Sequence, residues 1–272
     1  IKDTRSSGGN LIDLKNYSEI SDVWVIGRNN TLNKDSNFLN LLADIRNLTG
    51  ISSDNGIAIT GIGCKLNNLL VSNFGGKGIV ILGQLARFVH SFINNVQCFS
   101  NFIGFDFMIG GEYCVISNIS SSNNLLGIKI SAGNTFISSG AFNDNRIGLY
   151  MNKAGNDSHG AFSASQFNHS KLYSMVIDNI SHGHSFTACH VFEGDIYLVN
   201  SIGFNFIGGT IDANIYAEGG KTQRISYTSF QNAYWNRENG VQHNFNGTTS
   251  YLKMEGNFFM FETGENDGII NN

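Results

Sequence analysis

The chain of 272 residues contains no proline. Proline cannot donate a hydrogen bond to a sheet ladder, so it is confined to edge strands, strand starts and bulges. Its absence is therefore expected of a chain made mostly of short strands that stack between neighbours. Residues that favour helices are also scarce, whereas glycine is present 32 times and asparagine is abundant. Both residues tolerate the left-handed backbone that tight corners need.

Charged residues are few. They make up 14% of the chain, with a formal net charge of -4, against about 25% in an average globular protein. No basic patch is present, which argues against a nucleic-acid ligand. A surface rich in Asn, Ser and Gly suits neutral or mildly charged polyhydroxyl ligands.

Cysteine and histidine offer no metal-binding pattern. His182, His184 and His190 lie close together, but without a recognisable ligand spacing, so we expect no metal and no cofactor. The cysteines form no CxxC pair, and we expect inward-facing free thiols and folding in a reducing compartment. These cysteines are Cys64, Cys98, Cys114 and Cys189.

Long apolar runs are also missing. No stretch of 18 apolar residues occurs, so we expect no membrane insertion. The sequence begins at Ile1 without a methionine, and we expect it to be a fragment of a longer protein.

An irregular repeat of roughly 19 to 26 residues runs through the chain, in the range typical of solenoids. Each copy is a small or turn residue followed by an apolar-x-apolar triplet, which predicts a short strand. One such strand cannot form a core alone and must stack on its neighbours. The triplets begin at Ile79, Phe105, Ile128, Leu149, Met175, Ile196 and Ile215.

Within one repeat, residues 114–130 show three apolar points separated by Asn and Ser corners. Three faces per turn with parallel stacking predict an all-β fold, a right-handed single-stranded parallel β-helix or β-solenoid, with the handedness of parallel crossovers. Residues 51–240 are predicted to form the coils. Residues 1–50 are predicted to be an N-terminal cap or entry region with a helix at 37–47, and residues 241–272 a last coil or an oligomerisation segment.

Stacking Ile196 on Ile215 predicts a candidate catalytic site. Two carboxylates stacked at about 4.8 Å repel each other, so the pKa of one should rise. An acid beside an ionised carboxylate is the arrangement that glycoside hydrolysis needs. The candidates are Glu193, Asp212 and Asp195; a turn-capping role, or a register that differs by two residues, remains the alternative. The stacked outward pairs are Glu193 with Asp212, Asp195 with Asn214, and Tyr197 with Tyr216.

The centres of the triplets predict one outward row, in which Asp106 and Lys129 form an exposed ion pair of little energetic value. Tyr150, Tyr197 and Tyr216 lie in this row, and Tyr234 and Trp235 are expected one coil further on. Aromatic side chains combine an apolar face with a polar handle, so these five predict a carbohydrate platform. Packing between subunits is the alternative, because Tyr and Trp are also enriched in protein interfaces. The row is Val80, Asp106, Lys129, Tyr150, Val176, Tyr197 and Tyr216.

The coil repeat, the absent proline, the Asn and Gly corners and the segment at 206–216 resemble the β-helical part of a bacteriophage tailspike. Pectate-lyase-like enzymes share this fold, but their calcium-binding Asp array and catalytic Arg are not evident here. The resemblance implies a homotrimer of parallel rods on the virion tail, folded in the host cytoplasm. It also implies binding, and often cleavage, of a bacterial surface polysaccharide, either O-antigen or capsule.

Three functions follow as hypotheses. The first is an endo-acting polysaccharide depolymerase, with hydrolysis favoured over a lyase reaction. The second is a non-catalytic adhesin that binds the glycan without shortening it. The third is a structural fibre segment whose aromatic residues are buried between subunits.

Overall fold

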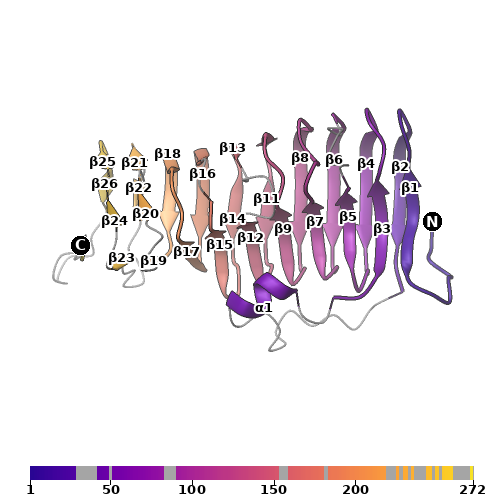
Figure 1. The fold of residues 1–272 in the computed structure, drawn as a ribbon, viewed down its shortest axis with the longest axis horizontal. Coiled ribbons are helices and arrows are strands. Elements are labelled where there is room, and N and C mark those ends of the chain that lie inside the picture. Colours follow the sequence, from indigo (N-terminus) through magenta and orange to yellow (C-terminus); the bar gives the residue numbers. More distant parts are fainter. Residues whose placement is uncertain are drawn as a thin grey trace.

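The fold is an all-β parallel β-solenoid, seen in a computed structural model as a row of stacked strands (Figure 1). The N-terminal strands lie at one end of the long axis and the C-terminal strands at the other. Within the described residues, the single helix is α1, Leu42–Asn47. The structure describes residues 1–28, 42–48, 51–82, 90–152, 159–180, 183–218, 225–226, 229–231, 234–235, 243–246, 249–250, 253–259 and 270–271.

The strands of the short-strand sheet come from successive coils and are joined in sequence order by parallel pairing. Its members are β1 (Gly9–Leu14), β3 (Asp54–Ile59), β5 (Lys77–Ile81), β7 (Ile103–Phe107), β9 (Leu126–Ile130), β12 (Ile147–Asn152), β15 (Tyr173–Asp178), β17 (Asp195–Val199), β19 (Ile215–Glu218), β23 (His243–Asn246) and β27 (Ile270–Asn271).

The long-strand sheet alternates with it along the chain. Its members are β2 (Glu19–Ile26), β4 (Lys65–Ser72), β6 (Phe92–Phe99), β8 (Val115–Ser122), β10 (Thr135–Ser138), β11 (Ala141–Asn143), β13 (Gly160–Ser163), β14 (Gln166–Asn168), β16 (His184–Phe192), β18 (Phe204–Asp212), β21 (Ser229–Gln231), β22 (Tyr234–Trp235), β25 (Lys253–Glu255) and β26 (Phe258–Phe259). A small separate sheet pairs β20 (Ile225–Ser226) with β24 (Thr249–Ser250).

The apolar triplets form the short strands, and their predicted register is confirmed. Ile79 pairs with Phe105, and the pairing continues through the first apolar residue of each triplet to Ile215. The first and third residues of the six triplets from Ile79 to Leu198, together with Ile215, point inward and are buried in the main core. Side chains alternate between the two faces of a strand, so each of these six triplets contributes two residues to one continuous core.

A left-handed residue divides the long strands into two halves. In β6 this residue is Asn95, with φ of 50°, and in β8 it is Asn118, with φ of 52°. The pairing between these two strands skips both residues. Each coil therefore contributes one short strand and one long strand that is divided at its left-handed residue.

A buried asparagine ladder follows the long strands at the corner that leads to the short strands. The side chain of Asn124 accepts a hydrogen bond from the backbone N–H of Asn101 at 2.8 Å, and Asn145 accepts one from the N–H of Asn124 at 3.0 Å. The Asn124 side chain also donates to the carbonyl of Cys98 at 3.2 Å. Because a buried N–H or C=O is costly when unpaired, this ladder stabilises a corner that no regular sheet pairing covers.

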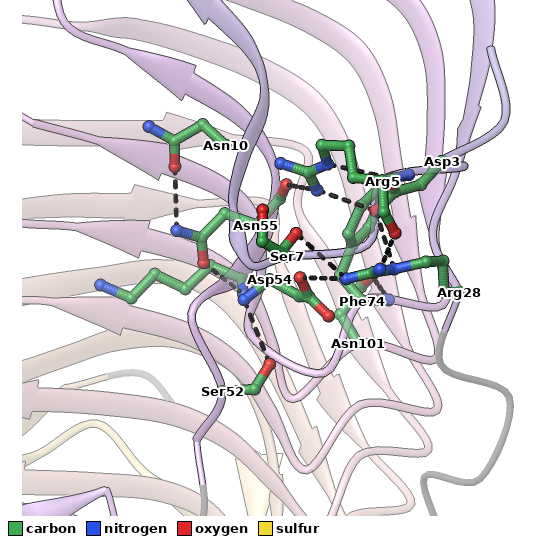
Figure 2. A network of polar contacts seen from close by, with 11 residues as sticks. Asp3, Arg5, Ser7, Asn10, Arg28, Ser52, Asp54, Asn55, Phe74 and Asn101 are labelled. Carbon is green, nitrogen blue, oxygen red and sulfur yellow. Dashed lines mark hydrogen bonds and ion pairs between the residues drawn. The ribbon is translucent and has the colours of Figure 1, made fainter.

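Residues 1–28, expected to belong to an entry region, contain the first strands of both sheets. Figure 2 shows the polar network that holds the chain start against them. Asp3 accepts hydrogen bonds from the Arg5 side chain at 2.8 and 2.9 Å and forms an ion pair with Arg28, which also pairs with Asp54 at 2.7 Å. The hydrogen bonds from Arg5 lower the pKa of Asp3 to about 2. The network therefore keeps Asp3 charged and fixes the segment before β1.

Helix α1 lies against the outer face of the short-strand sheet, beneath the strands from β9 to β15 (Figure 1). Its Ile45 is fully buried in a second apolar cluster that includes Tyr150 and Val176. Arg46 donates two hydrogen bonds to Asp178 at 2.6 and 2.7 Å, and Tyr150 donates one to the same carboxylate at 3.1 Å. The helix predicted at 37–47 is present over its last six residues, and 37–41 lie outside the described residues.

Candidate functional site

Tyr197 and Tyr216 lie on the outer face of the short-strand sheet, in neighbouring strands β17 and β19. They are paired in register, as the sequence predicts, and both are half-buried. Tyr173 in β15 extends the group, because its ring stacks on that of Tyr197 with centroids 5.6 Å apart and planes 16° apart. Tyr173 and Tyr197 also pack against the apolar cluster that contains Ile45 of α1. The three tyrosines, from three successive coils, therefore lie at the border of that cluster.

Asp195 lies beside these tyrosines. It pairs in register with Tyr173 and accepts a hydrogen bond from the side chain of Asn214 at 2.9 Å. The predicted stacking of Asp195 and Asn214 is thus present. Burial raises the pKa of Asp195, and the hydrogen bond from Asn214 opposes this only in part. Burial, followed by the charge of Asp195, also raises the pKa of Tyr216.

The backbones of Glu193 and Asp212 lie side by side in successive coils, where the N–H of Glu193 donates to the carbonyl of Asp212 at 3.1 Å. Their side chains have different environments. The Glu193 carboxylate is 56% exposed and lies 2.9 Å from the ring of His169, in the coil before it. Asp212 is 4% exposed, and its register partner is Phe192. The structure thus draws Glu193 toward His169, whereas Asp195 is the carboxyl that lies among the tyrosines.

Tyr150 has a different environment from the other tyrosines of its row. It is completely buried in the cluster beneath α1, and burial together with Asp178 raises its pKa. The expectation that it contributes an exposed ring is wrong, because the sequence pattern does not show that a helix covers this part of the sheet.

Asp106 corrects a second expectation about the row. It is fully buried, with Lys77 at 2.6 Å and Lys129 at 3.6 Å. The predicted ion pair with Lys129 is present, but the prediction that it is exposed is wrong. Lys77 is the closer partner, and it comes from the neighbouring strand β5.

Tyr234 and Trp235 belong to another face of the solenoid. They form β22, which pairs with Thr210 and Ile211 in the long-strand sheet. The five predicted aromatic residues therefore do not lie on one platform. Tyr197 and Tyr216 lie together, and Tyr173, which was not predicted, joins them.

An exposed apolar row on the long-strand sheet was missed by the sequence analysis. Phe92, Val115 and Phe136 occupy the same position in three successive coils and are in register. A signal for them exists in the sequence. Each precedes an inward isoleucine, so two apolar residues stand together where alternation predicts a polar residue at the outward position.

Within the described residues, no cluster of three or more His, Cys, Asp or Glu side chains is arranged to hold a metal ion. The described part of the chain also has no helix of sufficient length and hydrophobicity to cross a bilayer. The sequence matches no protein-family model and no curated protein.

Proposed function

We propose that this protein binds a bacterial surface polysaccharide on the outer face of its short-strand sheet, at Tyr173, Asp195, Tyr197, Asn214 and Tyr216. The observation that supports this best is the position of Asp195, a half-buried carboxyl with a raised pKa among three phenol groups. Tyrosines give apolar contact and a polar handle, and Asn214 adds an amide. This combination suits the mixed apolar and hydroxyl surface of a sugar chain.

Asp195 also favours cleavage of the bound glycan by hydrolysis. A carboxyl whose pKa is raised keeps its proton to a higher pH and can give it to the oxygen of the leaving sugar. A second carboxylate then attacks the sugar or activates water, and Asp212 and Glu193 are the candidates. In this proposal the proton passes from Asp195 to the leaving oxygen as the glycosidic bond breaks, and water supplies the hydroxyl group of the other sugar. We propose that the bonds cleaved lie within the chain, so that the protein is an endo-acting glycosidase.

The proposal extends to the parent assembly. We place the chain in a tailspike-type protein, a homotrimer of parallel right-handed solenoids on a virion tail that attaches to O-antigen or capsule. Support for this comes from the parallel solenoid fold and from the sequence resemblance. The proposed trimer is independent of the acid role proposed for Asp195, because all residues of that site belong to one chain.

The test is incubation of the purified protein with capsule and O-antigen preparations from candidate hosts, with glycan length followed by size-exclusion and fragments by mass spectrometry. We expect short, defined oligosaccharides. Asp195→Asn should lower the cleavage rate by about a hundredfold or more, and Asp22→Asn, which removes an exposed carboxylate of the distant strand β2, serves as the matched control. Glu193→Gln and Asp212→Asn test the second carboxylate.

Full activity of the Asp195→Asn protein would exclude the proposed acid. Loss of activity in Glu193→Gln, with Asp195→Asn active, would instead favour the stacked pair predicted from the sequence. If the wild type retains glycan without shortening it, the protein is an adhesin, and Tyr197→Ala should then weaken binding. Absence of both binding and cleavage would overturn the proposal.

A further inference from the structure

The row formed by Phe92, Val115 and Phe136 is the clearest exposed apolar feature of the long-strand sheet. These side chains are 51%, 57% and 55% exposed. They lie on β6, β8 and β10 and are direct register partners, so the row runs along the stacking axis. Phe92 and Phe136 are two coils apart, or roughly 10 Å, with Val115 between them. A contiguous row of exposed apolar side chains in successive coils is a candidate binding surface.

Polar but uncharged groups flank the row on both sides. On one side, Asn94 donates to Asn67 at 3.0 Å and accepts from Ser117 at 2.9 Å. On the other side, the rings of His90 and Tyr113 stack with centroids 5.1 Å apart. Across the three coils, segments 90–95, 113–118 and 134–139 contain no Asp, Glu, Lys or Arg. The exposed Lys65, the register partner of Phe92 in β4, marks the end of the uncharged row on that side. The surface therefore matches an uncharged ligand that has both apolar faces and hydroxyl groups.

The width of the row argues against a protein partner. Within the row, each coil contributes one exposed apolar side chain, and three half-exposed side chains present on the order of 300 Å². A stable protein interface buries about 800 Å² on each partner and involves about 20 to 30 residues. A narrow apolar row with hydrogen-bonding groups along both sides fits a ligand that is itself one residue wide.

From these observations, we infer that Phe92, Val115 and Phe136 form a second binding site, for an uncharged polysaccharide in an extended conformation that lies along the solenoid axis. The sugar rings stack on the two phenylalanines, and Asn94 and Ser117 bond to the hydroxyl groups. This site is on the other sheet from Asp195 and contains no carboxylate, so it binds without cleaving and is independent of the proposed hydrolysis.

The experiment is affinity electrophoresis of the wild type in native gels that contain hydroxyethylcellulose, galactomannan or linear β-1,3-glucan, with a glycan-free gel as reference. We expect retardation by at least one of these extended neutral glycans. The double variant Phe92→Ser/Phe136→Ser should bind about tenfold more weakly or worse. Phe99→Ser is the matched control, because Phe99 is exposed on the same strand β6 but beyond the left-handed Asn95. Circular dichroism confirms that each variant is folded.

Tyr197→Ala should leave the retardation within about twofold of wild type, which separates this site from the one at Asp195. The proposal is overturned if none of the three glycans retards the wild type, or if the double variant and wild type are retarded equally. It is also overturned if sedimentation shows an oligomer of the wild type that the double variant alone disrupts, since the row would then be an interface between copies of the chain.

Discussion

His184 lies beside a stack of aromatic rings in the core. It is paired in register with Phe204, and its ring centroid lies 5.4 Å from those of Phe162 and Phe186. The residue is buried, and within the described structure neither ring nitrogen has a hydrogen-bond partner. Burial, with a smaller effect from the charge of His159, lowers the pKa of His184 to about 3. The folded protein therefore holds this ring neutral.

This histidine should make the protein less stable in acid. An unfolded histidine binds its proton near pH 6.5, whereas His184 in the folded protein does so only near pH 3. Between these values the unfolded state binds more protons, so the free energy of unfolding falls as the pH falls. We expect His184 to lower the free energy of unfolding by about 2 kcal/mol at pH 5 relative to pH 7.5. Urea unfolding at both pH values measures this difference.

The variant His184→Phe, which continues the ring stack, should lose this contribution, and His184→Leu provides a second variant if Phe is too large. His90→Gln, a change at an exposed histidine, should keep the wild-type pH dependence. Equal pH dependence in the wild type and both core variants would show that His184 does not titrate as proposed.

At the residue scale, the sequence predicts the direction of a side chain better than its exposure. The period-2 pattern places Tyr150 and Tyr197 in one outward row, and this is what the pairing shows. Whether an outward residue meets solvent depends on what packs on the sheet. Helix α1 covers Tyr150 and not all of Tyr197, and no local pattern in the strands records that contact.

At the scale of elements, one ion pair between distant segments anchors α1. Arg46 and Asp178 are 132 residues apart in the chain, and the carboxylate of Asp178 is almost completely buried. The hydrogen bonds that Arg46 donates to Asp178 raise the pKa of Arg46. This contact, together with buried Ile45, fixes a short helix that would be marginal in isolation.

Replacing the arginine should loosen α1. Arg46→Ala leaves Asp178 with the Tyr150 hydroxyl and the Asn179 side chain as partners. We expect the free energy of unfolding to fall by about 2 kcal/mol. The exposed Asn47→Ala on the same helix is the control. The readout is hydrogen exchange in β12 and β15, which should increase in Arg46→Ala alone. Unchanged protection there would mean that Ile45 holds the helix without the ion pair.

The short strands were the most predictable elements, and the ends of the chain were the least. The triplet that starts at Ile196 predicts both its strand and its register with Ile215, because small residues before apolar pairs mark each coil. Tyr234 and Trp235 were expected one coil further on, beside the tyrosine row, but they lie in the long-strand sheet. The next short strand instead starts at His243, so the step after Ile215 does not follow the earlier spacing. The proposed site at Asp195 was therefore predictable from the register of the short strands. The location of Tyr234 in the other sheet was not.

At the scale of the whole molecule, each coil pairs with the coil before and the coil after it. Stability in such a quasi-one-dimensional fold is the sum of coil stabilities and the contacts between neighbours. The asparagine ladder is one of these contacts, since Asn124 bonds both to Asn101 and to Asn145. A change in the ladder should therefore act on nearby coils first.

Asn124→Ala tests this view of the molecule. The substitution removes the acceptor for the buried N–H of Asn101 and the donor to Cys98, and each orphaned group costs about 1–3 kcal/mol. Hydrogen exchange should rise from β6 to β12, while β2 and β18 keep their protection because they lie several coils away. Asn67→Ala, in a half-buried ladder on the outer face, should change exchange little. If protection instead falls equally in every coil, the solenoid unfolds as one cooperative unit, and stability is shared along its whole length rather than between neighbours.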